Sequence, residues 1–107
     1  MNSTDLFCDY YKKWIEIYKK DAIREATMAK YQMTQKWVEK LAPDMKVSEL
    51  TRTTYQQLLN NYAKEHERQT TLDFHHQLKG EILDAVDEGL IERNPTRKSI
   101  IRENTQS

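Results

Sequence analysis

The 107-residue sequence is poor in cysteine, in glycine and proline, and in long apolar runs. Its single cysteine, Cys8, excludes an internal disulfide, which favours a reducing compartment such as the cytosol. Purely apolar runs reach only two or three residues and no signal peptide is visible, so a membrane partner is not expected. Two glycines and two prolines are too few for the many turns of a β-sandwich or barrel, which favours a helical fold.

Residue patterns typical of enzyme sites are also scarce. The two glycines form no phosphate-binding loop, and Cys8 has no histidine near it in sequence that could activate it as a nucleophile. His66, His75 and His76 lack the spacing of metal ligands, since adjacent histidines on a helix point about 100° apart. The sequence therefore predicts no cofactor, no metal and no catalysis by this chain alone. We interpret the acids near the C-terminal end of the last helix as part of one exposed, solvated face, made of Asp73, Glu81, Asp84, Asp87 and Glu88.

Amphipathic segments predict an all-α bundle. The first helix is expected over residues 5–20, with Ser3 or Thr4 as its N-cap. The second is expected over residues 27–42 and ends at Pro43, because the residue before a proline avoids helical geometry. The buried face of the first helix is unusually aromatic and is expected to contain Phe7, Tyr10, Tyr11, Trp14, Ile17 and Tyr18.

The third helix is expected over residues 53–66, after a connector whose Val47 and Leu50 attach it to the core. A Thr70 or Thr71 N-cap opens the fourth helix, which extends to about residue 88. Gly89 then fits the left-handed position after the helix end. The third helix has one apolar side, formed by Tyr55, Leu58, Leu59 and Tyr62.

Charges are balanced in total, with 17 basic and 17 acidic residues, which argues against strong autonomous DNA binding unless the charges are segregated. The second helix is partly segregated, because its polar side contains Thr27, Lys30, Lys36 and Lys40, opposed only by Glu39. Such hydroxyl and lysine groups make phosphate contacts. An ordinary solvated helix face fits the same pattern.

The fourth helix has a similar edge, where His75 and Lys79 lie at the border of its apolar stripe. Together with the N-terminal turn from Arg68 to Thr71, this edge could face an anion, since helix N-termini offer free N–H groups. The alternative is a lysine whose stem lies along apolar surface while its ammonium stays in water.

Short motifs along nearly the whole chain, from Leu6 to Arg97, occur in a specific order. They comprise the aromatic Phe7, Tyr10 and Trp14; Thr27-x-x-x-Tyr31; Val47-x-x-Leu50-Thr51; Tyr55-Gln56-x-Leu58-Leu59; Thr70-Thr71 followed by His75, Leu78 and Lys79; and Ala85-Val86-x-x-Gly89-Leu90-Ile91-x-x-Asn94-Pro95. This order resembles the core-binding, SAM-like N-terminal domain of tyrosine recombinases of the phage-integrase type.

The resemblance implies a compact bundle of four to five helices that forms half of a C-shaped clamp around duplex DNA at the core recombination site. A catalytic domain with an Arg, His-x-x-Arg and Tyr set follows in the family, and here no histidine is followed three residues later by arginine. We therefore expect a non-catalytic core-binding domain over residues 1–95 and a linker or tail over 96–107. The partners implied are double-stranded DNA, the catalytic domain of the same recombinase and other protomers, in a bacterial or phage-encoded cytoplasmic protein. Carried over by position, the DNA-binding residues are Thr27, Lys30, Lys36, Arg68, Thr71, His75, Lys79, Arg97 and Lys98.

Two other classes compete with this interpretation. A helical protein–protein interaction module would use the aromatic and acidic faces to dock a partner. A helix-turn-helix regulator would need a short turn between two helices, and the connector from Pro43 to Thr51 is too long for that turn.

Overall fold

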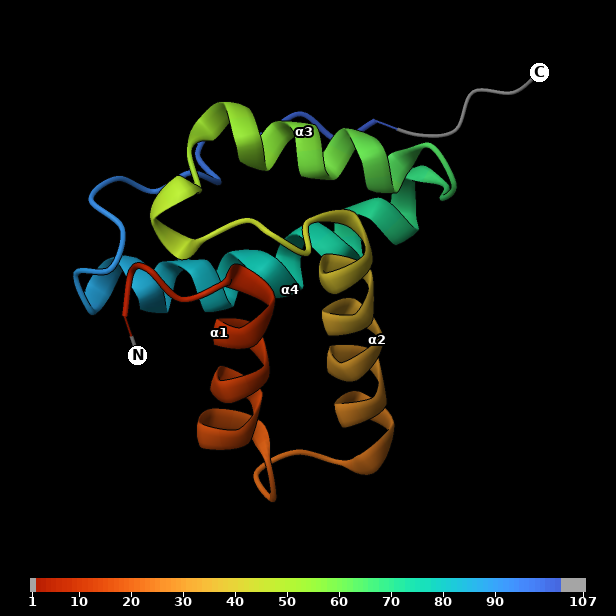
Figure 1. Ribbon diagram of the computed structural model, residues 1–107. Helices are drawn as coiled ribbons and strands as arrows, with labels where there is room; N and C mark the ends of the chain where they lie inside the picture. The colour runs from red at the N-terminus through yellow and green to blue at the C-terminus, as the bar shows by residue number, and fades with distance from the viewer. Residues whose placement is uncertain (1, 103–107) are drawn as a thin grey trace.

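The computed structural model describes residues 2–102 and contains four α-helices in this part of the chain (Figure 1). Helices α1 (Phe7–Trp14) and α2 (Glu25–Leu41) lie side by side and cross α3 (Arg52–Ala63) and α4 (Arg68–Asp87), as Figure 1 shows. No strand occurs among the described residues, apart from one isolated bridge between Leu6 and Lys46. The prediction of an all-α bundle is therefore confirmed.

The N-terminal segment is attached to the connector before α3. The Phe7 N–H donates to the Met45 carbonyl at 2.7 Å, and the Val47 N–H donates to the Asp5 carbonyl at 2.9 Å. Leu6, and not the predicted Ser3 or Thr4, occupies the N-cap position of α1. These backbone pairs replace the side-chain cap that the sequence suggested.

The end of the first helix differs from the prediction. Residues Ile15–Lys19 form a π-helical turn, η1, in which the Lys20 N–H donates to the Ile15 carbonyl at 2.9 Å. A π turn holds more residues than an α turn, so the 100° spacing behind the predicted aromatic face fails here. Ile17 and Tyr18 are exposed as a result, whereas Phe7, Tyr10, Tyr11 and Trp14 are buried as expected.

Helix α2 begins at Glu25, two residues before the predicted start, so Thr27 is an exposed first-turn residue. The helix ends before Pro43 as predicted. The connector contains a 3₁₀ turn, η2 (Val47–Glu49), and Val47 and Leu50 are buried as predicted. Thr51 then caps α3, accepting from the Thr54 N–H at 3.2 Å.

Helix α4 begins at Arg68, before the predicted Thr70 or Thr71 cap. Its C-terminal end is as predicted, because Gly89 has a φ of 79° and donates to the Val86 carbonyl, while the Leu90 N–H donates to Ala85. These two hydrogen bonds form a Schellman cap. The apolar side of α4 packs on α3, where Tyr62 and Phe74 stack with ring centroids 3.8 Å apart.

Beyond Pro95, the described part of the chain follows α3 (Figure 1). Gln56 holds the backbone of Ile100 from both sides, donating to its carbonyl at 2.8 Å and accepting from its N–H at 2.9 Å. Thr96 is buried. Residues 96–102 thus pack on the bundle, and the remainder of the predicted tail, 103–107, lies outside the described residues.

Candidate nucleic-acid interface

Two residues predicted to face DNA lie in the interior. Thr71 is fully buried, and its hydroxyl donates to the Glu67 carbonyl at 3.0 Å. His75 is only 8% exposed. Their expected position at an accessible edge is therefore wrong. The packing of α3 against this side of α4, which a wheel of one helix does not include, accounts for the error.

His75 forms a buried pair with Tyr55. The Tyr55 hydroxyl lies 2.8 Å from Nδ1 of His75. Burial, aided by the nearby His76 and Lys79, lowers the pKa of His75 to about 4. A neutral imidazole is a poor phosphate ligand but a good hydrogen-bond partner for the hydroxyl, so the structure gives His75 a role in the α3–α4 contact.

The other predicted residues are exposed, but they are distributed over different elements. Thr27, Lys30 and Lys36 lie on α2, and Lys79 lies on α4. Arg68, in the first turn of α4, donates from Nη1 to the Ile101 carbonyl at 3.1 Å. The structure brings Arg97 and Lys98 together at one groove, which also contains two arginines that the predicted set lacked, Arg52 and Arg93.

The predicted acidic face of α4 is only partly exposed. Glu81 is completely buried, and neither of its carboxylate oxygens has a hydrogen-bond partner in the part of the chain that the structure describes. Burial, and secondarily Asp84, raises the pKa of Glu81 well above its ordinary value. Asp84 accepts from Nε1 of Trp14 at 2.7 Å, so α1 covers this side of α4. The interpretation of Glu81 as a solvated acid is wrong, whereas Asp73, Asp87 and Glu88 are exposed.

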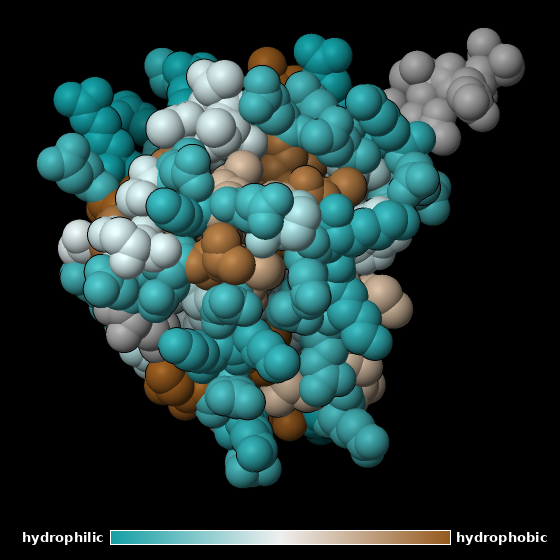
Figure 2. Space-filling model, in the orientation of Figure 1, coloured by the Kyte–Doolittle hydropathy of each residue, from teal (hydrophilic) through white to brown (hydrophobic). Residues whose placement is uncertain are grey.

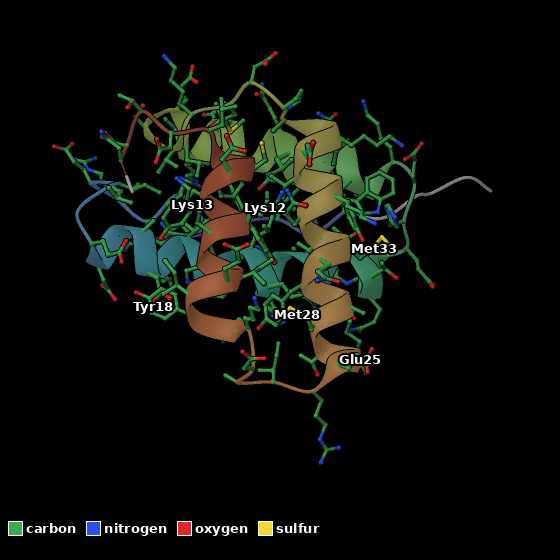
Figure 3. The ribbon with its side chains drawn as sticks, turned by 60° about the horizontal axis from the view of Figure 1, so that its bottom comes forward. Lys12, Lys13, Tyr18, Glu25, Met28 and Met33 are labelled. Carbon is green, nitrogen blue, oxygen red and sulfur yellow. The ribbon has the colours of Figure 1, made fainter. Side chains whose placement is uncertain are left out.

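The large hydrophobic side chains exposed among the described residues are Ile17, Tyr18, Met33 and Ile100. Figure 2 shows hydrophilic residues over most of one face, with small hydrophobic areas between them. In Figure 3, Tyr18 lies beside α1, Met28 lies between α1 and α2, and Met33 lies on the other side of α2. The exposed Tyr18 and Met33 therefore lie on opposite sides of the α1–α2 pair.

Neither a metal site nor a membrane helix emerges from residues 2–102. Within that range no three His, Cys, Asp or Glu residues are grouped as a metal site would need. In the same range no helix combines the length and the hydrophobicity that a bilayer crossing requires.

The fold and the exposed cations define a small helical domain with a mixed surface. No protein-family model matches the sequence, and no curated protein matches it. Among solved structures, the chain is similar to the N-terminal domain of the prophage pi2 integrase from Lactococcus lactis, with 32% identity and a TM-score of 0.87 over 92% of this chain and 93% of that one. It is also similar to a phage integrase fragment from Staphylococcus saprophyticus, with 29% identity and a TM-score of 0.74 over 86% and 84% of the two chains.

These similarities extend over nearly the full length of both partners in each comparison. The chain therefore belongs to the family of phage-integrase N-terminal domains, which confirms the resemblance stated from the motifs.

Proposed function

We propose that this chain is the non-catalytic DNA-binding domain of a site-specific tyrosine recombinase. In this proposal it grips the core recombination site as half of a C-shaped clamp, and its partners are duplex DNA, the catalytic domain of the same recombinase and other protomers on the DNA. The observation that carries the proposal is the 32% identity to an integrase N-terminal domain over 92% of the chain. The natural location is the cytoplasm of a bacterial cell.

Phosphate contacts from exposed hydroxyl and cationic side chains supply the affinity in this proposal. Such contacts position a protein on the duplex without reading its sequence. Because the total charge is zero, the isolated domain binds DNA weakly. Its affinity falls as salt rises because the contacts are to phosphates, and a second domain on the same chain raises the effective affinity. The residues proposed for these contacts are Thr27, Lys30, Lys36, Arg68, Lys79, Arg97 and Lys98.

Thr71 and His75 leave the set of proposed contacts because they are buried. A phosphate oxygen could reach His75 only if the Tyr55 hydrogen bond and the packing of α3 on α4 opened. We therefore assign His75 to the support of α4 and the DNA contacts to its exposed neighbours.

The proposal is tested by fluorescence anisotropy with a labelled duplex between about 50 and 200 mM salt. The double variant Lys30→Gln/Lys36→Gln is expected to make the negative slope of log affinity against log salt shallower by about two. Lys12→Gln/Lys13→Gln, exposed on α1 (Figure 3), removes the same charge and serves as the matched control, with the slope unchanged.

NMR titration adds a map of the contact. Backbone amide shifts are expected around Thr27, Lys30 and Lys79. No binding at about 50 mM salt, or shifts confined to Asp87 and Glu88, would overturn the assignment to DNA.

A further inference from the structure

A groove of about 1050 Å³ lies between the start of α3 and the segment that follows α4. Its floor is apolar and buried, with Leu50, Ile91 and Pro95. Residues from three distant parts of the sequence line it: the N-terminal segment, the stretch from Ser48 to Arg52, and the stretch from Leu90 to Lys98.

The charge around this groove is strongly one-sided. Arg52, Arg93, Arg97 and Lys98 line it and are exposed, and Glu92 is the one acid in its lining among residues 2–102. The whole chain, by contrast, has 17 basic and 17 acidic residues. Cations gathered at a concave surface with an apolar floor focus the electrostatic field, which raises the local concentration of anions.

Helix α3 adds to the positive field. Its first turn contains no acid and begins with Arg52, so a cation lies at the positive end of the helix dipole. That placement is unfavourable for the isolated helix and becomes favourable when an anion lies beside it. The Ser48 and Thr51 hydroxyls in the same lining are further donors.

The wall of the groove after α4 is held in place by local hydrogen bonds. Oδ1 of Asn94 accepts from the Thr96 N–H at 2.9 Å and from the Thr96 hydroxyl at 2.5 Å. The Ser99 hydroxyl then donates to the Thr96 carbonyl at 2.7 Å. Arg93 and Arg97 flank this turn, so binding an anion between them requires less ordering of the chain.

We infer that this groove is a binding site for the sugar-phosphate backbone of duplex DNA, contacted by Arg52, Arg93, Arg97 and Lys98. Guanidinium groups match phosphate oxygens in a bidentate geometry, and the apolar floor suits deoxyribose. The inference rests on the proposed function and deepens it, because it adds Arg52 and Arg93 and a contribution from α3.

The test compares the wild type with Arg52→Gln/Arg93→Gln in the same anisotropy titration. Loss of two phosphate contacts makes the negative slope of log affinity against log salt shallower by about two. It also weakens binding roughly tenfold or more at about 0.1 M salt. Glu92→Gln has the opposite effect and tightens binding, since it removes the one acid of the lining. Circular dichroism checks that each surface variant remains helical, and Lys12→Gln/Lys13→Gln again controls for total charge.

Each outcome has one meaning. If Arg52→Gln/Arg93→Gln binds like the wild type while Lys30→Gln/Lys36→Gln is weakened, the groove inference is wrong and the proposed function stands. If the wild type does not bind the duplex, both are wrong. An inorganic polyphosphate that binds as tightly as the duplex and loses the same affinity in the groove variant would identify a general polyanion site, which contradicts the assignment to DNA.

Discussion

Glu81 is the most unfavourable feature of the interior and offers a sharp test of the structure. It lies in the middle of α4, is fully buried, and has no hydrogen-bond partner among the described residues for either oxygen. Among residues 2–102 the buried hydroxyls of Tyr10 and Tyr11 also have no hydrogen-bond partner, and burial, with nearby acids including Glu81 as further causes, raises the pKa of both tyrosines. A charged carboxylate here is opposed by desolvation and by the neighbouring Asp84.

Replacing the carboxyl group with an apolar side chain of similar length is therefore expected to stabilise the fold. Burial of a polar group without a hydrogen bond costs about 1–3 kcal/mol in protein mutational series. Glu81→Met is expected to raise the free energy of unfolding by about that amount at pH 7. For a domain of this size, each kcal/mol corresponds to about 4–8 °C in Tm.

The raised pKa of Glu81 also predicts how the free energy of unfolding depends on pH. Because the pKa of Glu81 is raised in the folded state, the folded chain holds this proton more tightly than the unfolded chain does. Stability therefore falls as pH rises above the unfolded-state pKa, with a slope that approaches about 1.4 kcal/mol per pH unit until the folded-state pKa is reached. Both Glu81→Gln and Glu81→Met remove this slope.

Urea denaturation followed by circular dichroism measures both quantities, with an unchanged m-value as the check on two-state behaviour. Glu65→Gln, at an exposed position, is the matched control and leaves stability and slope as in the wild type. If Glu81→Met destabilises the domain by more than about 1 kcal/mol, the carboxylate has a partner in solution and the reasoning is refuted.

Three further tests concern the stability of the bundle. Burial lowers the pKa of His75 to about 4, so the folded chain binds this proton less tightly than the unfolded chain does. In the Glu81→Gln background, the free energy of unfolding is therefore expected to fall by up to about 3 kcal/mol as pH falls from 6.5 toward 4. His75→Gln removes this decline in the same denaturation series. Gly89→Ala costs about 1–2 kcal/mol in thermal melts, because the φ of Gly89 is 79°. Gly80→Ala, inside α4, stabilises by about 0.5–1 kcal/mol, because no described atom beyond the backbone of its own helix and its chain neighbours lies within 4 Å of the added Cβ. Trp14→Phe loses the hydrogen bond to Asp84 and costs about 1.5–3 kcal/mol. Asp84→Ala, which removes the acceptor, in the wild-type and Trp14→Phe backgrounds completes a double-mutant cycle that isolates that contribution.

The sequence predicted most of the helical framework because local signals determine it. Pro43 ends the second helix, Gly89 needs a left-handed backbone, and Val47 and Leu50 are apolar residues in an otherwise polar connector. Each of these features works through the residue itself or its immediate neighbours. Their predicted positions agree with the structure for that reason.

The wrong predictions concern mainly residues whose burial depends on a second helix packed over them. A helical wheel places Glu81 on a polar side of α4 and His75 at its edge, but α1 and α3 cover those sides. The π turn after Trp14 changes the periodicity without any proline or glycine to signal it. Arg52 joins Arg93 at the groove through a tertiary contact between segments about 40 residues apart, which no local pattern predicts.

The same buried acid bears on the zero net charge, which was the strongest argument against DNA binding. The formal value counts every acid as ionised. Burial raises the pKa of Glu81, so whenever this group holds its proton the chain has a net charge of +1, since one of its 17 acids no longer balances the 17 bases. Asp84 is half-buried and turned toward the Trp14 indole. Acids withdrawn into the bundle leave the exposed cations less opposed than the composition indicates. Glu81→Gln, at a buried position, is therefore expected to change DNA affinity less than Glu92→Gln, at the rim of the groove, which should raise it. Anisotropy on these two variants separates the count of charges from their location, and equal effects on affinity would contradict the argument.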